Sequence, residues 1–309
     1  MGDHTPVLLQ EAVAGLDVKP DGIYVDMTFG RGGHTKAILD RLTTGRVYAI
    51  DRDIQAIEAG QALVASHPQQ LTLIHANFTQ VRLALAEHGV DRVDGILMDL
   101  GVSSPQFDDP DRGFSYREDA PLDMRMDRRQ TLTAAQLVAT RDVGELTRIF
   151  RDYADEPQAY QIAKAIVKDR GTKPLLTTGD LVALIKRVKP QKELSKKGHP
   201  AKQAFQALRI AVNNEIENLE TALKEAVALL KPRGRLAVIT FHSGEDRLVK
   251  NYFKSLCVSE GTRHGLAAMV KTPELAYEYH NRQPIVPGET EANDNHRAVG
   301  AKLRIIIRK

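Results

Sequence analysis

The stretch Asp26-Met27-Thr28-Phe29-Gly30-Arg31-Gly32-Gly33-His34 decides the fold of this chain, because it joins a carboxylate directly to a glycine-dense turn. The apolar run Ile23–Val25 precedes it, and a second short apolar run ends at Asp51. An open parallel sheet holds an adenosine-containing cofactor at its carboxyl edge in this way. The stretch therefore predicts a parallel α/β sheet with a cofactor site at the end of its first strand.

Around this stretch, strand-like and helical runs alternate along the chain. Strands are expected at Ile23–Asp26, Arg46–Ile50, Leu71–His75 and Val93–Asp99, and helices at Thr35–Leu42 and Ile54–Ala65. Later segments are helical at Ala134–Ala139, Val143–Asp152, Gln158–Arg170 and Thr178–Val188, with Asp142 and Thr178 as N-caps. Strand patterns return at Gly234–Phe241 and Ala301–Ile307, and Glu260–Asn295 is expected to contain a long loop. We predict an α/β domain from residues 1–112 and 207–309, interrupted by an all-helical insert at 113–206.

Composition narrows the class of protein. The 309 residues are 42% hydrophobic and 27% charged, with a net charge of only +3, as in an ordinary soluble domain. The single cysteine, Cys257, excludes an intramolecular disulfide and a cysteine-rich zinc site, and no metal site is predicted. The segment Met1–Gln10 has no apolar core of signal-peptide length. These observations favour a cytoplasmic protein with no membrane contact.

The glycine turn suits S-adenosylmethionine better than a dinucleotide. The dinucleotide fingerprint has a third glycine where this chain has Thr35, and Thr35 would crowd the helix against the strand. Asp26, before the turn, would repel a pyrophosphate but tolerates a cationic sulfonium. Asp51 is placed to accept the ribose hydroxyls, and Phe78 to pack on the adenine. An NAD-dependent dehydrogenase and a plain turn between two solvated acids stay open as alternatives.

The run after Asp99 carries a second signal. Methyltransferases that act on exocyclic amines usually have an acid or amide at this strand end, followed by a motif like D-P-P-Y. Here Asp99 is followed by Leu100-Gly101-Val102, so the match is partial.

Together with the stretches at Asp26 and Asp99, further blocks of the sequence resemble the family of bacterial 16S ribosomal RNA cytosine N4-methyltransferases, ribosomal RNA small subunit methyltransferase H. The matching blocks are His4–Leu8, Asp26–His34, Asp99–Gln106, Gly113–Tyr116, Pro121–Asp127, Phe205–Glu215, Phe241–Arg247 and Lys302–Arg304. The resemblance implies a Rossmann-like class I S-adenosylmethionine-dependent methyltransferase sheet. It also implies methylation of one cytosine amine in the decoding region of the small-subunit RNA.

The resemblance implies cofactor contacts at Gly32, Gly33, His34, Asp51, Phe78, Asp99 and Gln106. The chain departs from the family's usual pattern at Gln203, Gly244 and Val299-Gly300. These departures touch the RNA side and the C-terminal elements rather than the cofactor site.

The methyl donor is already activated, so the enzyme's main task is to position the reactants. A cytosine amine is a poor nucleophile because its lone pair is conjugated with the ring. We expect Asp99 to accept a hydrogen bond from the amine and orient it; the alternative is that Asp99 contacts only the cofactor. The target base must leave its stack to reach such a pocket.

Five residues are candidates for lining that pocket: His4, Asp123, Arg125, His242 and Ser243. Each has a plain alternative. His242 and Ser243 would cap a helix near Glu245, Asp123 and Arg125 would pair with each other, and His4 would be an ordinary terminal residue.

The segment Lys186–Lys202 is the strongest basic run. It carries Lys186, Arg187, Lys189, Lys192, Lys196, Lys197 and Lys202 against the single acid Glu193. We predict that it neutralises RNA phosphates, with Lys196 and Lys197 at its centre, the alternative being a solvated loop. The expected partner is 16S ribosomal RNA in the small ribosomal subunit. An assembly factor that binds cofactor without turnover stays open, as does a homodimer.

Overall fold

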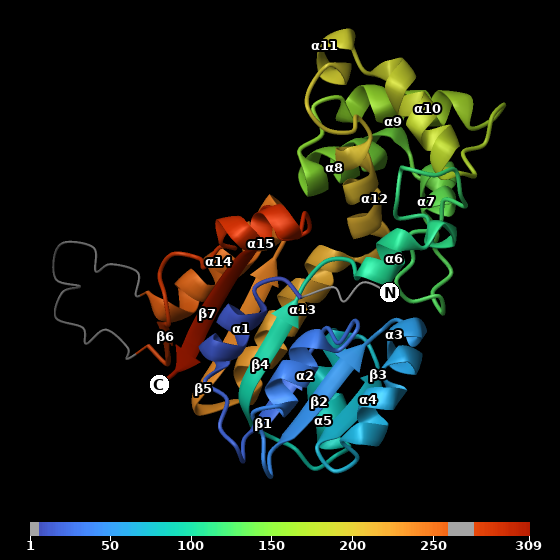
Figure 1. Ribbon diagram of the computed structural model, residues 1–309. Helices are drawn as coiled ribbons and strands as arrows, with labels where there is room; N and C mark the ends of the chain where they lie inside the picture. The colour runs from blue at the N-terminus through green and yellow to red at the C-terminus, as the bar shows by residue number, and fades with distance from the viewer. Residues whose placement is uncertain (1–5, 259–274) are drawn as a thin grey trace, which may run out of the picture. The chain divides into compact units, whose positions relative to one another are not determined.

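The structure, a computed structural model, describes residues 6–258 and 275–309 and divides the chain into two units (Figure 1). The first comprises Met1–Gly101 and Glu217–Lys309, and the second comprises Val102–Ile216. The boundaries expected from sequence, at 112/113 and 206/207, fall inside the second unit. Arg112 and Asn213 explain this difference, because both donate hydrogen bonds to backbone carbonyls of residues 124–126 within that unit.

The apolar runs of the first unit form one sheet with strand order β3-β2-β1-β4-β5-β7-β6. The strands are β1 Ile23–Asp26, β2 Arg46–Asp51, β3 Leu71–His75, β4 Val93–Asp99, β5 Leu230–Thr240, β6 Tyr277–Tyr279 and β7 Lys302–Arg308. β1 to β5 are parallel, whereas β7 runs antiparallel to both β5 and β6. Since Asp99 of β4 pairs with Ile239 of β5, the two distant parts of the chain share one sheet, as predicted.

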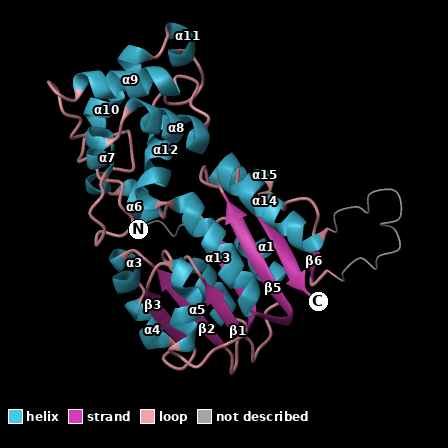
Figure 2. Cartoon of the chain, turned by 180° about the vertical axis from the view of Figure 1, so that it is seen from behind, coloured by secondary structure: helices cyan, strands magenta, loops and turns pink. Residues whose placement is uncertain are grey.

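Helices cover both faces of this sheet (Figure 2). They are α1 Leu9–Leu16, α2 Gly33–Leu39, α3 Ile54–Ala59, α4 Gln61–Ser66, η1 Phe78–Gln80, α5 Val81–Ala86, α13 Glu215–Leu229, α14 Ser243–Cys257 and α15 Glu289–Asp294. Leu16 of α1 and Ile38 of α2 are buried against one face, and Leu85 of α5 and Phe253 of α14 against the other. None of the described helices is both long and apolar enough to cross a membrane.

Two details differ from the expected elements of the first unit. The helix expected over 54–65 is divided into α3 and α4 at Gly60, where a Cβ atom would lie 2.6 Å from both the Phe29 ring and the Leu73 side chain. The loop expected at 260–295 lies partly outside the described residues, and its described part carries β6 and α15.

The second unit is helical, as predicted, around its own apolar core. Its helices are α6 Ser104–Asp108, η2 Pro110–Arg112, α7 Ala134–Thr140, α8 Val143–Ala154, α9 Ala159–Asp169, α10 Thr178–Val188, α11 Gln191–Leu194 and α12 Lys202–Asn213. Asp142 caps α8, as expected, by accepting from the Glu145 amide. The cap expected at Thr178 is wrong. Thr177 caps α10, because the Thr178 hydroxyl is buried and donates to the Glu118 carbonyl at 2.7 Å.

Candidate functional site

The turn after β1 lies between the carboxyl ends of β2 and β4. The Met27 amide donates to the Leu97 carbonyl of β4 at 2.9 Å, and the Phe29 amide donates to the Ile50 carbonyl of β2 at 2.9 Å. β1 is therefore joined on both sides just beyond its last residue. The chain continues from β1 to β2 and β3 on one side of β1, whereas β4 and β5 lie on its other side. Open α/β sheets bind their ligands at such a reversal of strand order.

Asp26 organises this turn from inside the protein. Its side chain is buried, and its Oδ2 accepts from the Thr35 hydroxyl at 2.7 Å while its Oδ1 accepts from the Thr28 amide at 3.0 Å. Burial raises the pKa of Asp26, and the hydrogen bonds from Thr35 and Thr28 oppose that rise. Thr35 therefore does not merely fill the place of a third glycine. It holds the carboxylate that shapes the turn, a role that no local sequence pattern reveals.

Glycines give the turn its path. Gly30 and Gly32 have φ values of 55° and 75°, in the left-handed region that favours glycine. A Cβ atom on Gly32 would also lie 2.7 Å from the Phe29 ring. At Gly33 the reason is different, since a Cβ atom there would lie 2.2 Å from Cγ of Pro6. Gly33 thus lets the N-terminal segment pack onto the start of α2.

Asp51 and Phe78 border the same edge. Oδ2 of Asp51 accepts from the Gly30 amide and Oδ1 from the Asp53 amide, both at 2.8 Å. Burial raises the pKa of Asp51, and these two amides oppose the rise. Phe78 is half-buried at the start of η1, with the Arg52 guanidinium 6.0 Å from its ring centroid. Asp51 thus couples β2 to the glycine turn.

Asp99 ends β4 beside the turn and has spare hydrogen-bonding capacity. Its amide donates to the Thr28 hydroxyl at 2.6 Å, and its Oδ2 lies 3.5 Å from Nδ1 of His34. Its Oδ1 atom is buried and has no hydrogen-bond partner among the described residues. Burial raises the pKa of Asp99 to about 6; His34 opposes this rise, and the charges of Asp26 and Glu245 add to it. A buried acceptor without a donor is costly unless a ligand supplies one.

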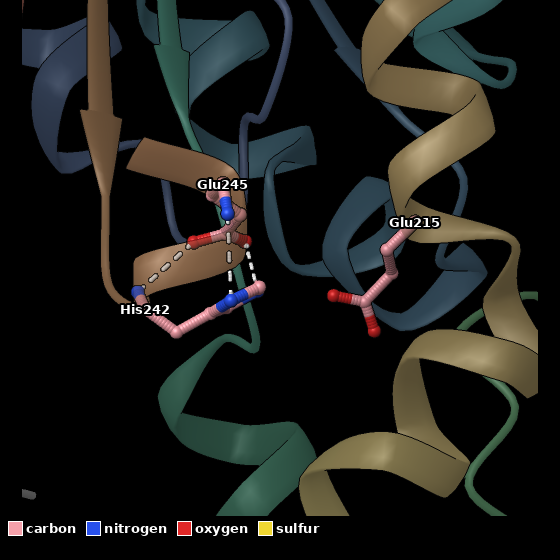
Figure 3. Close-up of side chains that lie close together, drawn as sticks. All are labelled: Glu215, His242 and Glu245. Atoms are coloured by element: carbon pink, nitrogen blue, oxygen red, sulfur yellow. Dashed lines mark hydrogen bonds and ion pairs between the residues drawn. The ribbon is translucent and has the colours of Figure 1, made fainter. Parts of the chain in front are cut away.

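His242 caps α14, which confirms the plain alternative for this residue (Figure 3). Its Nδ1 accepts from the Glu245 amide at 3.4 Å, and Oε2 of Glu245 accepts from the Phe241 amide at 2.9 Å. Ser243 is exposed at the first position of the helix. Next to this cap, Asp246 accepts from Arg304 at 2.7 Å and from Lys302 at 3.0 Å, so the start of α14 is tied to β7. His4 lies outside the described residues.

In the second unit, Gln106 closes a capping box. Its Oε1 accepts from the Ser103 amide at 3.0 Å, and the side chain is buried. Asp123 and Arg125 pair with each other through two contacts of 2.8 Å, which confirms their structural alternative. Burial raises the pKa of Asp123, but hydrogen bonds from Arg125 outweigh it and leave that pKa below its ordinary value.

Several residues of the basic segment form ion pairs with acids of the second unit. Lys189 is buried and donates to the buried Glu156 at 2.7 Å, and Arg187 pairs with Asp169. Lys196 pairs with Glu193 at 2.7 Å, although it stays exposed. The remaining exposed cations of the segment are Lys186, Lys192, Lys197 and Lys202. Its available charge is therefore smaller than the sequence indicates.

The departure at Gln203 also has a local explanation. Its Nε2 donates to the carbonyls of Ala154 and Asp155 at 3.1 and 3.0 Å, where α8 ends. These carbonyls have no partner within their own helix. Gln203 therefore closes the C-terminus of a neighbouring helix.

Comparison with known proteins gives a consistent result over the whole length. A profile of the MraW methylase family matches residues 1–309. The chain is 48% identical over 309 residues to ribosomal RNA small subunit methyltransferase H of Lactiplantibacillus plantarum, covering 99% of this chain and 97% of that protein. It is also 48% identical to the proteins of that name from Limosilactobacillus fermentum, over 99% and 98% of the two chains, and Streptococcus equi subsp. equi, over 98% and 96%.

Proposed function

The chain belongs to the MraW methylase family, and we propose that it methylates the exocyclic N4 amine of cytosine 1402 in the decoding region of 16S ribosomal RNA. It is a ribosomal RNA methyltransferase, and S-adenosylmethionine is its cofactor. Family membership sets aside the dehydrogenase alternative. The choice of base and atom is the proposal, and the arrangement around Asp99 supports it.

The residues at the carboxyl edge fit S-adenosylmethionine. Oδ1 of Asp99 is a buried acceptor that needs a donor, and the Asp51 carboxylate keeps lone pairs beyond the two amides it accepts. At Gly32 and Gly33, Phe29 and Pro6 occupy the positions that Cβ atoms would take, which fixes the path of the turn that borders the site. Within the first unit we assign the cofactor to Gly32, Gly33, His34, Asp51, Phe78 and Asp99. The contact that the resemblance implies for Gln106 falls on the second unit. When bound, the cofactor supplies an electrophilic methyl group on a cationic sulfur.

Asp99 is the observation that carries the proposal. A carboxylate with a buried, unpartnered oxygen is suited to accept a hydrogen bond from an amine N–H group. Such a bond draws the amine lone pair out of conjugation with the cytosine ring and directs it. Because the pKa of Asp99 is about 6, the carboxylate is mostly ionised at neutral pH and accepts rather than donates.

We assign phosphate binding to the second unit, with Ser243 and His242 of the first unit as further candidates for RNA contacts. The exposed lysines of the basic segment would neutralise phosphates, while Lys189 would not, because its ammonium group is buried against Glu156. Asp123 and Arg125 would act as a fixed pair, and Ser243 as an exposed polar group at the start of α14. His242 would contribute through the helix terminus that it caps. The substrate would be the RNA within the small ribosomal subunit.

The test is transfer of labelled methyl from S-adenosylmethionine to small ribosomal subunits and to free 16S RNA that lack the modification. Mass spectrometry of nucleosides should identify N4-methylated cytidine. Asp99→Ala should abolish turnover even at S-adenosylmethionine concentrations that saturate the variant, as determined by calorimetry. Full turnover by Asp99→Ala would exclude the orienting role, and binding without any transfer by the wild type would support the assembly-factor alternative.

RNA binding is tested separately from transfer. Lys196→Glu with Lys197→Glu should weaken binding to small subunits and lower its dependence on salt, while cofactor affinity stays unchanged. Lys173→Glu, at an exposed lysine of the same unit outside the basic segment, is the matched control. Equal RNA affinity in the double variant and the wild type would exclude a role for these lysines.

A further inference from the structure

An acceptor oxygen lies near each of the two ring nitrogens of His34. The side chain is 5% exposed; its Nε2 lies 3.2 Å from the Val7 carbonyl oxygen, and its Nδ1 lies 3.5 Å from Oδ2 of Asp99. The Val7 carbonyl is itself anchored, because the next amide, that of Leu8, donates to Oε1 of Glu291 at 2.7 Å. The imidazole ring therefore lies between a fixed carbonyl and the carboxylate assigned to the reacting amine.

These contacts determine which nitrogen carries a proton. A carbonyl oxygen only accepts hydrogen bonds, so the Nε2 atom of His34 must be an N–H donor toward Val7. In a neutral ring this leaves Nδ1 without a proton, 3.5 Å from Oδ2 of Asp99. A lone pair and a carboxylate repel each other at that distance, whereas a positive charge on the ring attracts the carboxylate.

We propose that His34 is a positioning residue that acts as the counter-charge of Asp99, and that it thereby keeps the carboxylate charged and turned so that Oδ1 faces the reacting amine. The inference rests on the proposed role of Asp99. The resemblance implies only a cofactor contact for His34, so the pairing with Asp99 adds a second role to this residue.

The charges around Asp99 make such a partner necessary. Asp26 of β1 and Glu245 of α14 both act on Asp99 with like charge, and His34 of α2 provides the opposing positive charge. Thr28 offers only its hydroxyl oxygen to the Asp99 amide and adds no charge. Without His34, burial and the two acids would favour the protonated carboxyl group, which cannot accept through the same oxygen.

Two substitutions separate the two sides of the ring. In His34→Gln the side-chain amide extends to the position of Nε2, so the donor toward Val7 is kept and the partner of Asp99 is lost. In His34→Asn the shorter amide lies near the position of Nδ1, so a donor toward Asp99 is kept and the contact with Val7 is lost. The pair of variants distinguishes a role toward Asp99 from a role in packing the N-terminal segment.

The first measurement needs no catalysis. Long-range proton–nitrogen NMR of the imidazole rings, with His34 assigned by its absence in His34→Gln, should place a proton on Nε2 of His34, toward Val7. The Nδ1 resonance of His34 should change in Asp99→Asn. A neutral Nδ1–H tautomer in the wild type, or a spectrum unchanged by Asp99→Asn, would overturn the proposal.

The second measurement is the pH profile of kcat for methyl transfer. In the wild type the acid limb should follow Asp99, with a pKa of about 6. Loss of a nearby opposite charge in His34→Gln should raise that pKa, so a smaller fraction of Asp99 is ionised at pH 6. Turnover by His34→Gln should therefore fall several-fold at pH 6 and change little at pH 8.5. His34→Asn should lose less turnover at pH 6 than His34→Gln.

A purely cofactor-binding His34 would give a different pattern. Both variants would then raise KM for S-adenosylmethionine and leave the acid limb in place, which refutes the proposal. If instead Asp99→Ala retains full turnover, the proposed function of Asp99 fails, and the NMR result still decides whether His34 responds to the charge of Asp99.

Discussion

The hydroxyl of Thr35 should contribute measurably to the stability of the first unit, and this contribution should depend on pH. In Thr35→Val the side chain keeps nearly the same shape but no longer donates to Oδ2 of Asp26, a bond of 2.7 Å to a buried carboxylate. A hydrogen bond to a charged group is worth about 1.5–3 kcal/mol, and a neutral one about 0.5–1.5 kcal/mol. We therefore expect Thr35→Val to lower the free energy of unfolding by about 1.5–3 kcal/mol at pH 8.

The sign of the pH dependence follows from Asp26. Its pKa in the folded protein is raised, chiefly by burial, so ionised Asp26 weakens folding increasingly as the pH rises through that pKa. The Thr35 bond opposes this loss, and its removal raises the pKa further. The difference between Thr35→Val and wild type should accordingly shrink toward the value for a neutral bond, about 0.5–1.5 kcal/mol, as the pH falls through that pKa toward the unfolded value of ~4.

Urea-induced unfolding, followed by hydrogen exchange of peptides from β1 and β4, measures this quantity in the first unit alone. Thr43→Val is the matched control, because the Thr43 hydroxyl is exposed and donates to a neutral carbonyl, that of Pro20, at 3.3 Å; it should change stability by less than about 0.5 kcal/mol. An equal loss at both pH values, or one no larger than the control at pH 8, would refute the role assigned to Thr35.

Three further predictions concern other parts of the chain. Glu156→Gln or Lys189→Met alone should destabilise the second unit by about 3–5 kcal/mol, while the double variant recovers most of the loss, since a lone buried charge is worse than none; additive losses in thermal unfolding would contradict this. Gly32→Ala should lower stability and weaken S-adenosylmethionine binding more than Gly89→Ala. Both glycines have φ above 70°, but of the two only Gly32 faces the Phe29 ring. Equal effects in thermal melts and calorimetry would show that contact with the ring does not matter. The Cys257 thiol, whose pKa burial raises to about 11, should be alkylated by iodoacetamide at pH 8 far more slowly in the folded protein than in urea, and equal rates by intact mass would show that it is accessible and ionised.

The strands near the cofactor edge were predictable because each is a short apolar run with a polar boundary. β1, β3 and β4 have the expected bounds, and β2 extends one residue further, to Asp51. Such runs specify strands locally, since burial on both faces demands continuous apolar residues. The same local rule explains why α10 has its expected bounds, while the choice between Thr177 and Thr178 as its cap depended on a contact with Glu118 some sixty residues earlier.

Contacts between residues far apart in sequence account for what the pattern did not reveal. The charge of Lys189 looked available for RNA, but its partner Glu156 lies in the connection between α8 and α9, 33 residues earlier. From the sequence alone, Thr35 was expected to crowd the helix against the strand. Its hydroxyl instead donates to Asp26, which becomes a neighbour only when α2 packs on β1. By contrast, Asp123 and Arg125 are only two residues apart, and they form the ion pair that this short spacing allowed.

The position of β4 in the sheet has a consequence for synthesis on the ribosome. One side of β4 pairs with β1 within the first hundred residues, but its other side waits for β5, which begins at Leu230. At about 5–20 residues per second, translation of the intervening helical unit takes roughly 6–25 s. During that time the strand that ends in Asp99 exposes an unpaired edge, which is a site for aggregation. Folding of the helical unit does not supply the missing strand. We therefore expect a chaperone that covers extended apolar segments to bind this protein during synthesis and to release it once β5 has emerged.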